Sequence, residues 1–196
     1  MSENPMIFPV GDSKTFGSST DTPPGRGYPQ YLCDDLHLST GDFWTELTRY
    51  AVPGGMVSDV TAGIDAILSS RANTPQPYSA WIGLGAVDVL NFPLTEATWK
   101  ADYAYILDAI RAKWSQIKIY NTICWRRNYA TECDTLATWM TEVLADGRSS
   151  WAFSGDDERV WMENGDDGIT YTDDGVHPNH AGYLEAATQR RAVMGF

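Results

Sequence analysis

The feature that most constrains the fold is a regular alternation between short apolar runs and longer segments with helical periodicity. Apolar runs at residues 6–10, 79–85 and 117–124 are typical of buried strands. Between them, apolar side chains of residues 58–68 and 99–110 recur every three or four positions, as on one face of a helix. Strands joined by helical crossovers form parallel sheets. The sequence therefore predicts an α/β fold with a central, mostly parallel sheet of about five strands.

Five further segments extend this pattern. We predict helices at residues 28–38, 131–144 and 179–193, a strand at 48–55 and a weak strand at 150–153. The region from Ser154 to Gly175 is rich in Gly and Asp, so we expect a long irregular surface loop there. Pro9 has no N–H for a sheet ladder, so we place it at the end of the first strand.

Length and charge limit the function classes. A chain of 196 residues suits a single domain, 1–196, with a proper core. Lys and Arg number 14 against 26 Asp and Glu, and the formal charge of −12 argues against nucleic acid and anionic membranes as partners. No apolar run is long enough to span a bilayer, and the opening "MSENP" is unlike a signal peptide. We expect a cytoplasmic protein, or a domain excised from a secreted or virion protein.

Cysteines and histidines give little indication of a metal site. The three cysteines are too few for a disulfide scaffold, although Cys124 and Cys133 could pair. His177 and His180 form an H-x-x-H pattern, but no third ligand is evident. We therefore expect no metal and no cofactor, and we leave the oligomeric state open.

The stretch "MIFPVGDSKTFG" places Ser13 directly after the first predicted strand. Gly, Asp and Ser are common turn residues, so a plain strand-to-helix connection explains the tripeptide as well as a nucleophile does. A serine hydroxyl is a poor nucleophile unless a base, an orienting carboxylate and oxyanion donors surround it. The N–H groups of Ser13 and Gly55 could supply two such donors at the carboxyl edge of the sheet.

The stretch "DDGVHPNHAGY" supplies the missing acid and base. Asp174 stands three residues before His177, which allows its carboxylate to accept a hydrogen bond from the imidazole and leave the other ring nitrogen as a base. The alternative is a turn cap beside an ordinary surface histidine. Both segments follow predicted strands of the same sheet edge, which favours a Ser13, His177 and Asp174 unit.

Four motifs resemble those of the SGNH, or GDSL-type, hydrolases, in the order that this family has them. They are "GDSKTFG", "PGGMVSD" through Gly55, "LGAVDV" and "DGVHP", and together they span nearly the whole chain. The resemblance implies a three-layer, flavodoxin-like α/β fold and an esterase or related acyl hydrolase. It also implies that Ser13 is the nucleophile, with Asp174 and His177 completing the triad.

The third motif departs from the family pattern. Val87 stands where the family has its oxyanion-hole asparagine, and valine donates no hydrogen bond. Either the hole has only the Ser13 and Gly55 N–H groups, or Asn91 turns its amide into it. Gly54 is a neighbouring candidate for the glycine. Lys14 also replaces the apolar residue often found after the serine, and Asp88 is interpreted as a structural loop acid.

Trp125 follows the fourth predicted strand and could form a wall against which a sugar stacks, although simple packing is the alternative. We therefore predict a serine esterase that removes short acyl groups, acetyl first, from a small-molecule or carbohydrate ester. One alternative is a thioesterase or lysophospholipase of the same fold. Another is a non-catalytic binding or structural module that lost the oxyanion-hole asparagine.

Overall fold

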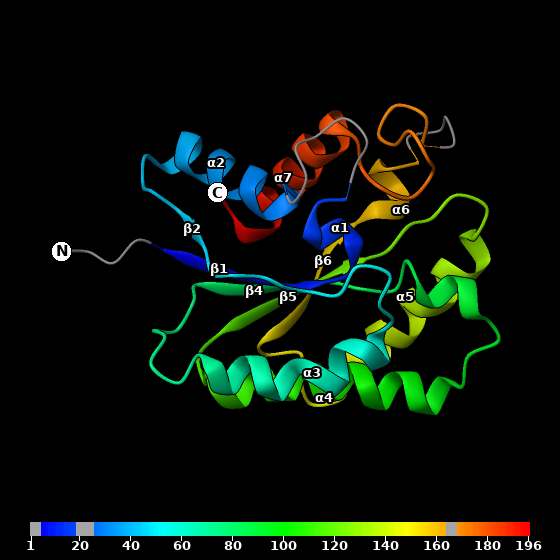
Figure 1. Cartoon of the computed structure of the whole chain (residues 1–196), viewed down its shortest axis with the longest axis horizontal. Coiled ribbons are helices and arrows are strands. Elements are labelled where there is room, and N and C mark those ends of the chain that lie inside the picture. The colour runs from blue at the N-terminus through cyan, green and yellow to red at the C-terminus, as the bar shows by residue number, and fades with distance from the viewer. Residues whose placement is uncertain (1–4, 19–25, 164–167) are drawn as a thin grey trace.

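The structure is a computed structural model of the chain and describes residues 5–18, 26–163 and 168–196. Strands and helices alternate along it, as Figure 1 shows. None of the described helices is both long and apolar enough to cross a membrane. The strands are β1 (Met6–Gly11), β2 (Thr45–Glu46), β3 (Tyr50–Ala51), β4 (Ser79–Gly83), β5 (Lys118–Ile123) and β6 (Ala152–Asp157). The helices are α1 (Ser13–Phe16), α2 (Tyr28–Thr40), α3 (Val57–Ser70), α4 (Glu96–Lys113), α5 (Ala130–Ala145), α6 (Glu158–Trp161) and α7 (His180–Met194), with a 3-10 helix η1 (Asp88–Asn91).

The sheet is parallel throughout the described strands. Its order is β2-β1-β4-β5-β6, and β3 pairs with β1 beyond the end of β2. Because β2 and β3 lie along the same side of β1, the order corresponds to the flavodoxin-like arrangement. The direction of strand addition reverses between β1 and β4, which are neighbours. Ligands of open α/β sheets bind at such a crevice, beyond the carboxyl ends of the strands.

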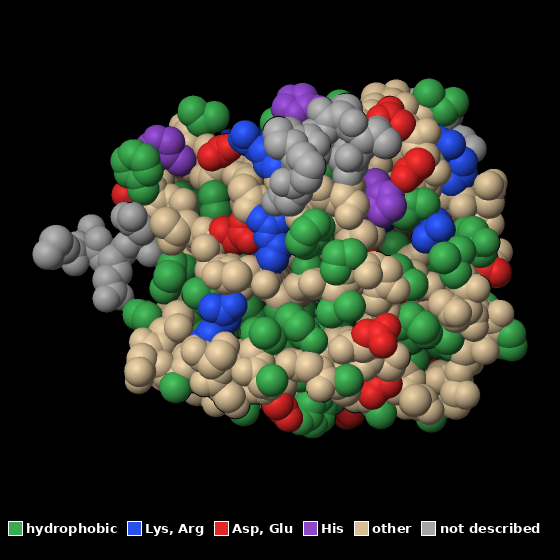
Figure 2. Space-filling model, viewed as in Figure 1, with side chains coloured by type: hydrophobic (Ala, Val, Ile, Leu, Met, Phe, Trp, Pro, Cys, Tyr) green, Lys and Arg blue, Asp and Glu red, His purple; other side chains and the backbone are tan. Residues whose placement is uncertain are grey.

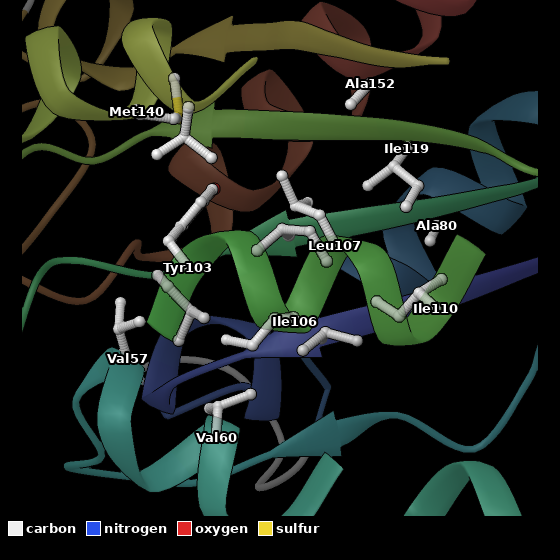
Figure 3. Packing of buried hydrophobic residues seen from close by; sticks show 14 of the residues in the cluster. Val57, Val60, Ala80, Tyr103, Ile106, Leu107, Ile110, Ile119, Met140 and Ala152 are labelled. Atoms are coloured by element: carbon white, nitrogen blue, oxygen red, sulfur yellow. The ribbon is translucent and has the colours of Figure 1, made fainter. Parts of the chain in front are cut away.

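Helices cover both faces of this sheet. In Figure 1, α2 and α7 lie on one face, and α3, α4 and α5 lie on the other. In Figure 3, Ile110 of α4 lies near the sheet residues Ala80 and Ile119, and Tyr103 of α4 points toward Met140 of α5. These side chains and that of Ile106 are buried. Full burial of a large apolar side chain stabilises a fold by about 1.5–3 kcal/mol. The helical stripe read from the sequence is thus the stripe that is buried, and the three-layer α/β fold is confirmed.

The first strand corrects two expectations. Pro9 lies inside β1, paired with β4, instead of at the strand's end. The carbonyls of Ile7 and Gly11 accept hydrogen bonds of 2.8 and 2.9 Å from the opposite side, where β2 and β3 lie. Pro9 falls between them, where the neighbouring chain is not paired, so its missing N–H leaves no ladder bond unmade. The strand predicted at residues 48–55 is reduced to the short β3, because residues 48 and 49 are not paired with β1 and the chain turns at residues 53 and 54.

The loop expected at residues 154–175 is partly regular, although residues 164–167 lie outside the described residues. β6 and α6 occupy the segment up to residue 161, so the prediction is wrong there. Asp156 is only 4% exposed within β6 because Arg190 of α7 binds its carboxylate, with Nε 3.0 Å from Oδ1. Asp is rare in buried strands, and its partner here comes from a distant part of the chain.

Strands β1 and β4 approach each other closely at the crevice, where Gly11 ends β1. A Cβ at Gly11 would lie 2.0 Å from Oγ1 of Thr15 and 2.5 Å from the carbonyl oxygen of Gly83, which is backbone and cannot turn away. We expect Gly11→Ala to lower the free energy of unfolding by about 1–3 kcal/mol, measured by urea denaturation, because the insertion overpacks a closed site.

Gly83→Ala is the matched control. Gly83 is the cross-strand partner of Gly11, but the atom nearest to a Cβ at this position would be Oγ1 of Thr15, at 3.2 Å. This variant should lose less than half as much stability as Gly11→Ala. Equal losses would contradict the assigned crowding.

Candidate active site

The turn after β1 presents Ser13 as the first residue of α1. Asp12 caps this helix, and its Oδ1 accepts a hydrogen bond of 2.9 Å from the N–H of Lys14. Ser13 is 9% exposed, against 1% for Asp12 and 5% for Lys14, so it is the least buried of the three residues at this turn. As the first amide of a helix, its N–H has no acceptor within the helix. The same residue therefore offers both a hydroxyl and an unused backbone donor.

Ser13, His177 and Asp174 form one hydrogen-bonded chain. The Oγ of Ser13 lies 2.9 Å from Nε2 of His177. The Nδ1 of His177 lies 2.6 Å from Oδ2 of Asp174, so this nitrogen donates to the carboxylate. Neutral imidazole then has a lone pair on Nε2, directed at the serine hydroxyl. This is the geometry that a nucleophile, a base and an orienting acid require.

The carboxylate of Asp174 is held ionised. Partial burial raises its pKa, but hydrogen bonds from the His177 ring and from the N–H groups of His177 and Val176 lower it by more, and the net pKa lies below the ordinary value. Both N–H groups donate to Oδ1 at 2.8 Å, whereas Oδ2 accepts the hydrogen bond from the imidazole of His177. The acid is therefore an acceptor near neutral pH.

The loop that carries Asp174 and His177 is fixed to the segment that follows β5. The N–H of Arg127 donates to the carbonyl of Gly175 at 3.0 Å. Gly175 has φ 77°, and a Cβ there would lie 2.8 Å from Cβ of Arg127. Glycine is thus required both by the left-handed backbone and by the close approach.

The residues expected around an oxyanion make other hydrogen bonds. The N–H of Gly55 donates to the carbonyl of Val52 at 2.8 Å, closing a turn, and would have to give up this bond to serve an oxyanion. The amide of Asn91 donates from Nδ2 to the carbonyl of Val87 at 3.0 Å, which closes η1. Val87 begins that turn and brings no polar side-chain atom. The structure therefore does not direct the Asn91 amide into the hole.

Trp125 is not an exposed wall. Its side chain is 4% exposed and packs in the cluster between the sheet, α2, α6 and α7. A Cβ at Gly168 would lie 2.4 Å from its indole, so this glycine closes over the ring. The burial contradicts the stacking surface predicted from sequence, and the packing alternative is correct.

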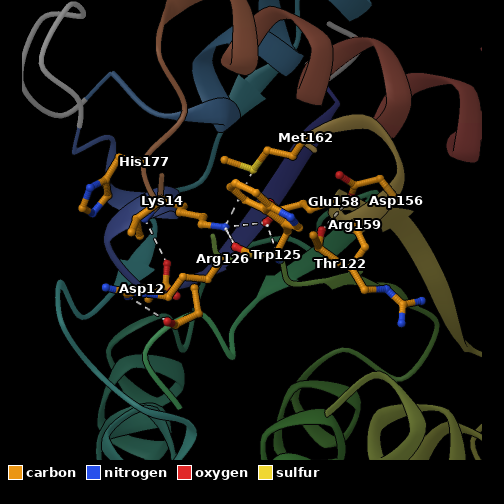
Figure 4. A network of polar contacts seen from close by, with 12 residues as sticks. Asp12, Lys14, Thr122, Trp125, Arg126, Asp156, Glu158, Arg159, Met162 and His177 are labelled. Carbon is orange, nitrogen blue, oxygen red and sulfur yellow. Dashed lines mark hydrogen bonds and ion pairs between the residues drawn. The ribbon is translucent and has the colours of Figure 1, made fainter. Parts of the chain in front are cut away.

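A buried charge network lies behind Ser13 (Figure 4). The ammonium of Lys14 donates to Oε2 of Glu158 at 2.6 Å and to the carbonyl of Trp125 at 2.7 Å. The other carboxylate oxygen of Glu158 lies 3.3 Å from Nη2 of Arg190. Burial raises the pKa of Asp12 to about 6, although the Lys14 ammonium lowers it. The sequence did not predict that Glu158 and the Trp125 carbonyl bind Lys14. Its only indication of such a network was a charged residue directly after the serine.

Asp88 has the structural role expected for it. Its carboxylate accepts hydrogen bonds from the N–H of Val57, at 3.2 and 3.3 Å, and from Nε1 of Trp99, at 3.0 Å. It is 1% exposed, and burial raises its pKa to about 6 despite these bonds. Asp88 thus ties the loop after β4 to the start of α3 and to α4.

The remaining expectations concern the other histidine and the cysteines. His180 begins α7, and its Nδ1 lies 2.9 Å from the hydroxyl of Tyr31. His177 and His180 therefore have different partners. Cys124 and Cys133 are free, buried thiols, so the pairing considered from sequence is not formed. The hydrogen bond from Cys133 and burial raise the pKa of Cys124.

Known structures share this fold over nearly the full length of the chain. A Clostridium thermocellum family 3 carbohydrate esterase superposes with a TM-score of 0.75 at 13% identity, covering 98% of this chain and 96% of that one. A lipase/acylhydrolase from Enterococcus faecalis has a TM-score of 0.74 at 19% identity, covering 97% and 96%. A mutant acetyl esterase with an acetate ion has a TM-score of 0.72 at 15% identity, covering 94% and 93%. At these identities the likeness establishes the fold.

No curated protein sequence matches the chain. The profile of the GDSL-like Lipase/Acylhydrolase family, in contrast, matches residues 10–184. The match begins at the end of β1 and includes the serine turn and the Asp174–His177 loop. It therefore covers every segment that forms the hydrogen-bonded chain, and the protein belongs to the GDSL-like Lipase/Acylhydrolase family.

Proposed function

We propose that the protein is a serine esterase that hydrolyses short-chain acyl esters through an acyl-enzyme intermediate. The observation that carries the proposal is the continuous hydrogen-bonded chain from Ser13 through His177 to Asp174. Its distances suit proton transfer without rearrangement. Membership of an acyl-hydrolase family supports the same reaction class.

The proposed cycle needs only groups on this chain and water. Oγ of Ser13 attacks the ester carbonyl, while Nε2 of His177 takes the hydroxyl proton. The tetrahedral intermediate collapses, the bond to the leaving alcohol breaks, and His177 returns the proton to that alcohol. Water then attacks the acyl-serine with the same base. Asp174 stays ionised and holds the imidazole throughout, which agrees with its lowered pKa.

A small acyl group, acetyl in particular, is the proposed substrate feature, and a carbohydrate is the proposed alcohol. Acidic and basic residues, including Asp12 and Lys14, surround Ser13 in the sequence and form the buried network behind it. On the face in Figure 2, Lys and Arg side chains are separated by acidic and uncharged ones rather than gathered in a basic patch. Similar folds include a carbohydrate esterase and an acetyl esterase.

The second candidate, a thioesterase or lysophospholipase, needs a cavity for a longer acyl chain. About 160 Å³ of space lies between the starts of α3 and α4, lined in part by Met56, Leu94 and Trp99, with Asp88 at its wall. Ser58, Thr98 and Asp102 also line it, so an acyl chain bound there would contact polar as well as apolar groups. The preferred acyl-chain length of the substrate distinguishes the two candidate enzymes. A loss of activity when Ser13 is replaced distinguishes both from a non-catalytic module.

The triad is tested by single substitutions. Ser13→Ala and His177→Ala should each lower kcat by about 10⁴-fold or more, because nucleophile and base act as one unit. The measurement is initial-rate hydrolysis of a chromogenic acetyl ester, with circular dichroism to check folding. His180→Ala is the matched control, since it lies three residues from the base and contacts Tyr31. It should keep kcat within threefold of the parent. An essential His180 beside a dispensable His177 would refute the assignment.

Substrate size is tested with a panel of chromogenic esters from acetyl to octanoyl. The specificity constant kcat/KM should fall at least tenfold from the shortest to the longest chain. Polar and charged groups next to the serine would be left poorly solvated beside a long alkyl chain. Ser13→Ala supplies the background rate for each ester. A preference for octanoyl over acetyl would support the thioesterase or lysophospholipase candidate instead.

A further inference from the structure

Three consecutive residues after β5 each bind a different part of the candidate active site. The carbonyl of Trp125 accepts from the ammonium of Lys14, next to the serine, at 2.7 Å. The guanidinium of Arg126 donates from Nη1 to the carbonyl of Ala86 at 3.0 Å. The N–H of Arg127 donates to the loop that carries the acid and base. This segment, residues 125–127, therefore sets the relative positions of all three loops.

Arg126 is distinguished within this segment by where its side chain goes. Ala86 directly precedes Val87, the position at which the family's oxyanion-hole asparagine is missing. Figure 4 draws the Arg126 side chain extending past Asp12, toward the side of the network on which His177 lies. The charged end of Arg126 thus lies beside the backbone that should have presented the asparagine amide.

The charge of Arg126 is not neutralised within the described part of the chain. Lys14 and Arg190, its neighbours in the network, are paired with carboxylates, whereas Arg126 has no ion-pair partner among the described residues. Its described side-chain contacts are the Ala86 carbonyl and the ring of Tyr129, 5.8 Å from the guanidinium carbon. One of five N–H groups is used in that hydrogen bond. A cation with spare donors therefore stands at a half-buried position beside the predicted oxyanion site.

We propose that Arg126 supplies the oxyanion-hole hydrogen bond that Val87 cannot. The inference rests on the proposed esterase function and adds a catalytic residue to it. When the bond between Oγ of Ser13 and the carbonyl carbon forms, an electron pair moves onto the carbonyl oxygen. Arg126 donates a hydrogen bond to that oxygen and keeps its proton, and the pair returns when the alcohol leaves. A charged donor is about twice as strong as a neutral amide, and a guanidinium stays charged at every working pH.

The first experiment separates transition-state stabilisation from substrate binding. Arg126→Ala should lower kcat for a chromogenic acetyl ester by about 10²–10³-fold, because that is the typical effect of removing one oxyanion donor. KM should stay within about threefold, since the bond forms mainly as charge develops. Arg126→Lys keeps a charged donor and should retain more activity than Arg126→Ala. A kcat within threefold of the parent in both variants would overturn the proposal.

Arg71→Ala is the control for removal of an arginine. Arg71 also donates to a backbone carbonyl, that of Thr48, but it caps the far end of α3. It should leave kcat unchanged. Thermal unfolding of each variant identifies a purely structural role. If Arg126→Ala lowers Tm while the folded fraction keeps full kcat, then Arg126 only holds the loop and the proposal fails.

A double variant tests whether Arg126 does the work of the asparagine. Val87→Asn should change kcat less than threefold in the parent, and should raise it at least tenfold in Arg126→Ala. Equal gains in both backgrounds would show that the donor position was vacant, and would overturn the proposal. Failure of the proposed function is distinguishable, because the parent would then hydrolyse no ester faster than Ser13→Ala.

Discussion

The structure around the serine depends on the burial of one ammonium group. Lys14 is 5% exposed, and an unpaired charge at such a position would cost several kcal/mol. Glu158 and the Trp125 carbonyl compensate it from α6 and from the end of β5. Since Lys14 follows Ser13 directly, the same contacts fix the turn that presents the hydroxyl. Removal of one partner from such a pair typically costs about 3–5 kcal/mol, so the turn has little freedom to move.

The topology explains why this turn faces Asp174 and His177. β1 and β4 are neighbours, and the chain leaves them toward opposite layers, so a crevice opens at their carboxyl ends. Gly11 and Gly83 bring the two strands together at that point without side chains. The Asp174–His177 loop reaches the same edge from the other side through its bond to Arg127. The strand order, more than any local motif, brings these distant segments together, so that Oγ of Ser13 lies 2.9 Å from Nε2 of His177.

Because Val87 stands where the family has a hydrogen-bond donor, the proposed replacement donor, Arg126, comes from the loop after β5. With Gly55 and Asn91 engaged in other hydrogen bonds, a hole built from backbone alone has few donors. In the proposed arrangement, the Arg126 guanidinium, which is bound to the Ala86 carbonyl, replaces a neutral side-chain donor with a charged one from the loop after the neighbouring strand. The proposed donor therefore comes from the loop after β5 instead of the loop after β4.

From the sequence alone, hydrophobic periodicity predicts the parallel α/β sheet, because burial leaves a local period, and the family resemblance implies the three layers. The sequence also indicates, through the spacing of Asp174 and His177 and through that resemblance, the three residues that the structure joins by hydrogen bonds. It did not determine that Trp125 is buried, that the Gly55 N–H is engaged or that Asp156 lies in a strand. Only the tertiary structure decided these, since each depends on the partner that packs beside it. The partner of Lys14, for instance, stands 144 positions away. No local sequence pattern predicts contacts between residues so far apart. The free-energy cost of burying the charge, and the ion pair that offsets this cost, exist only in the folded chain.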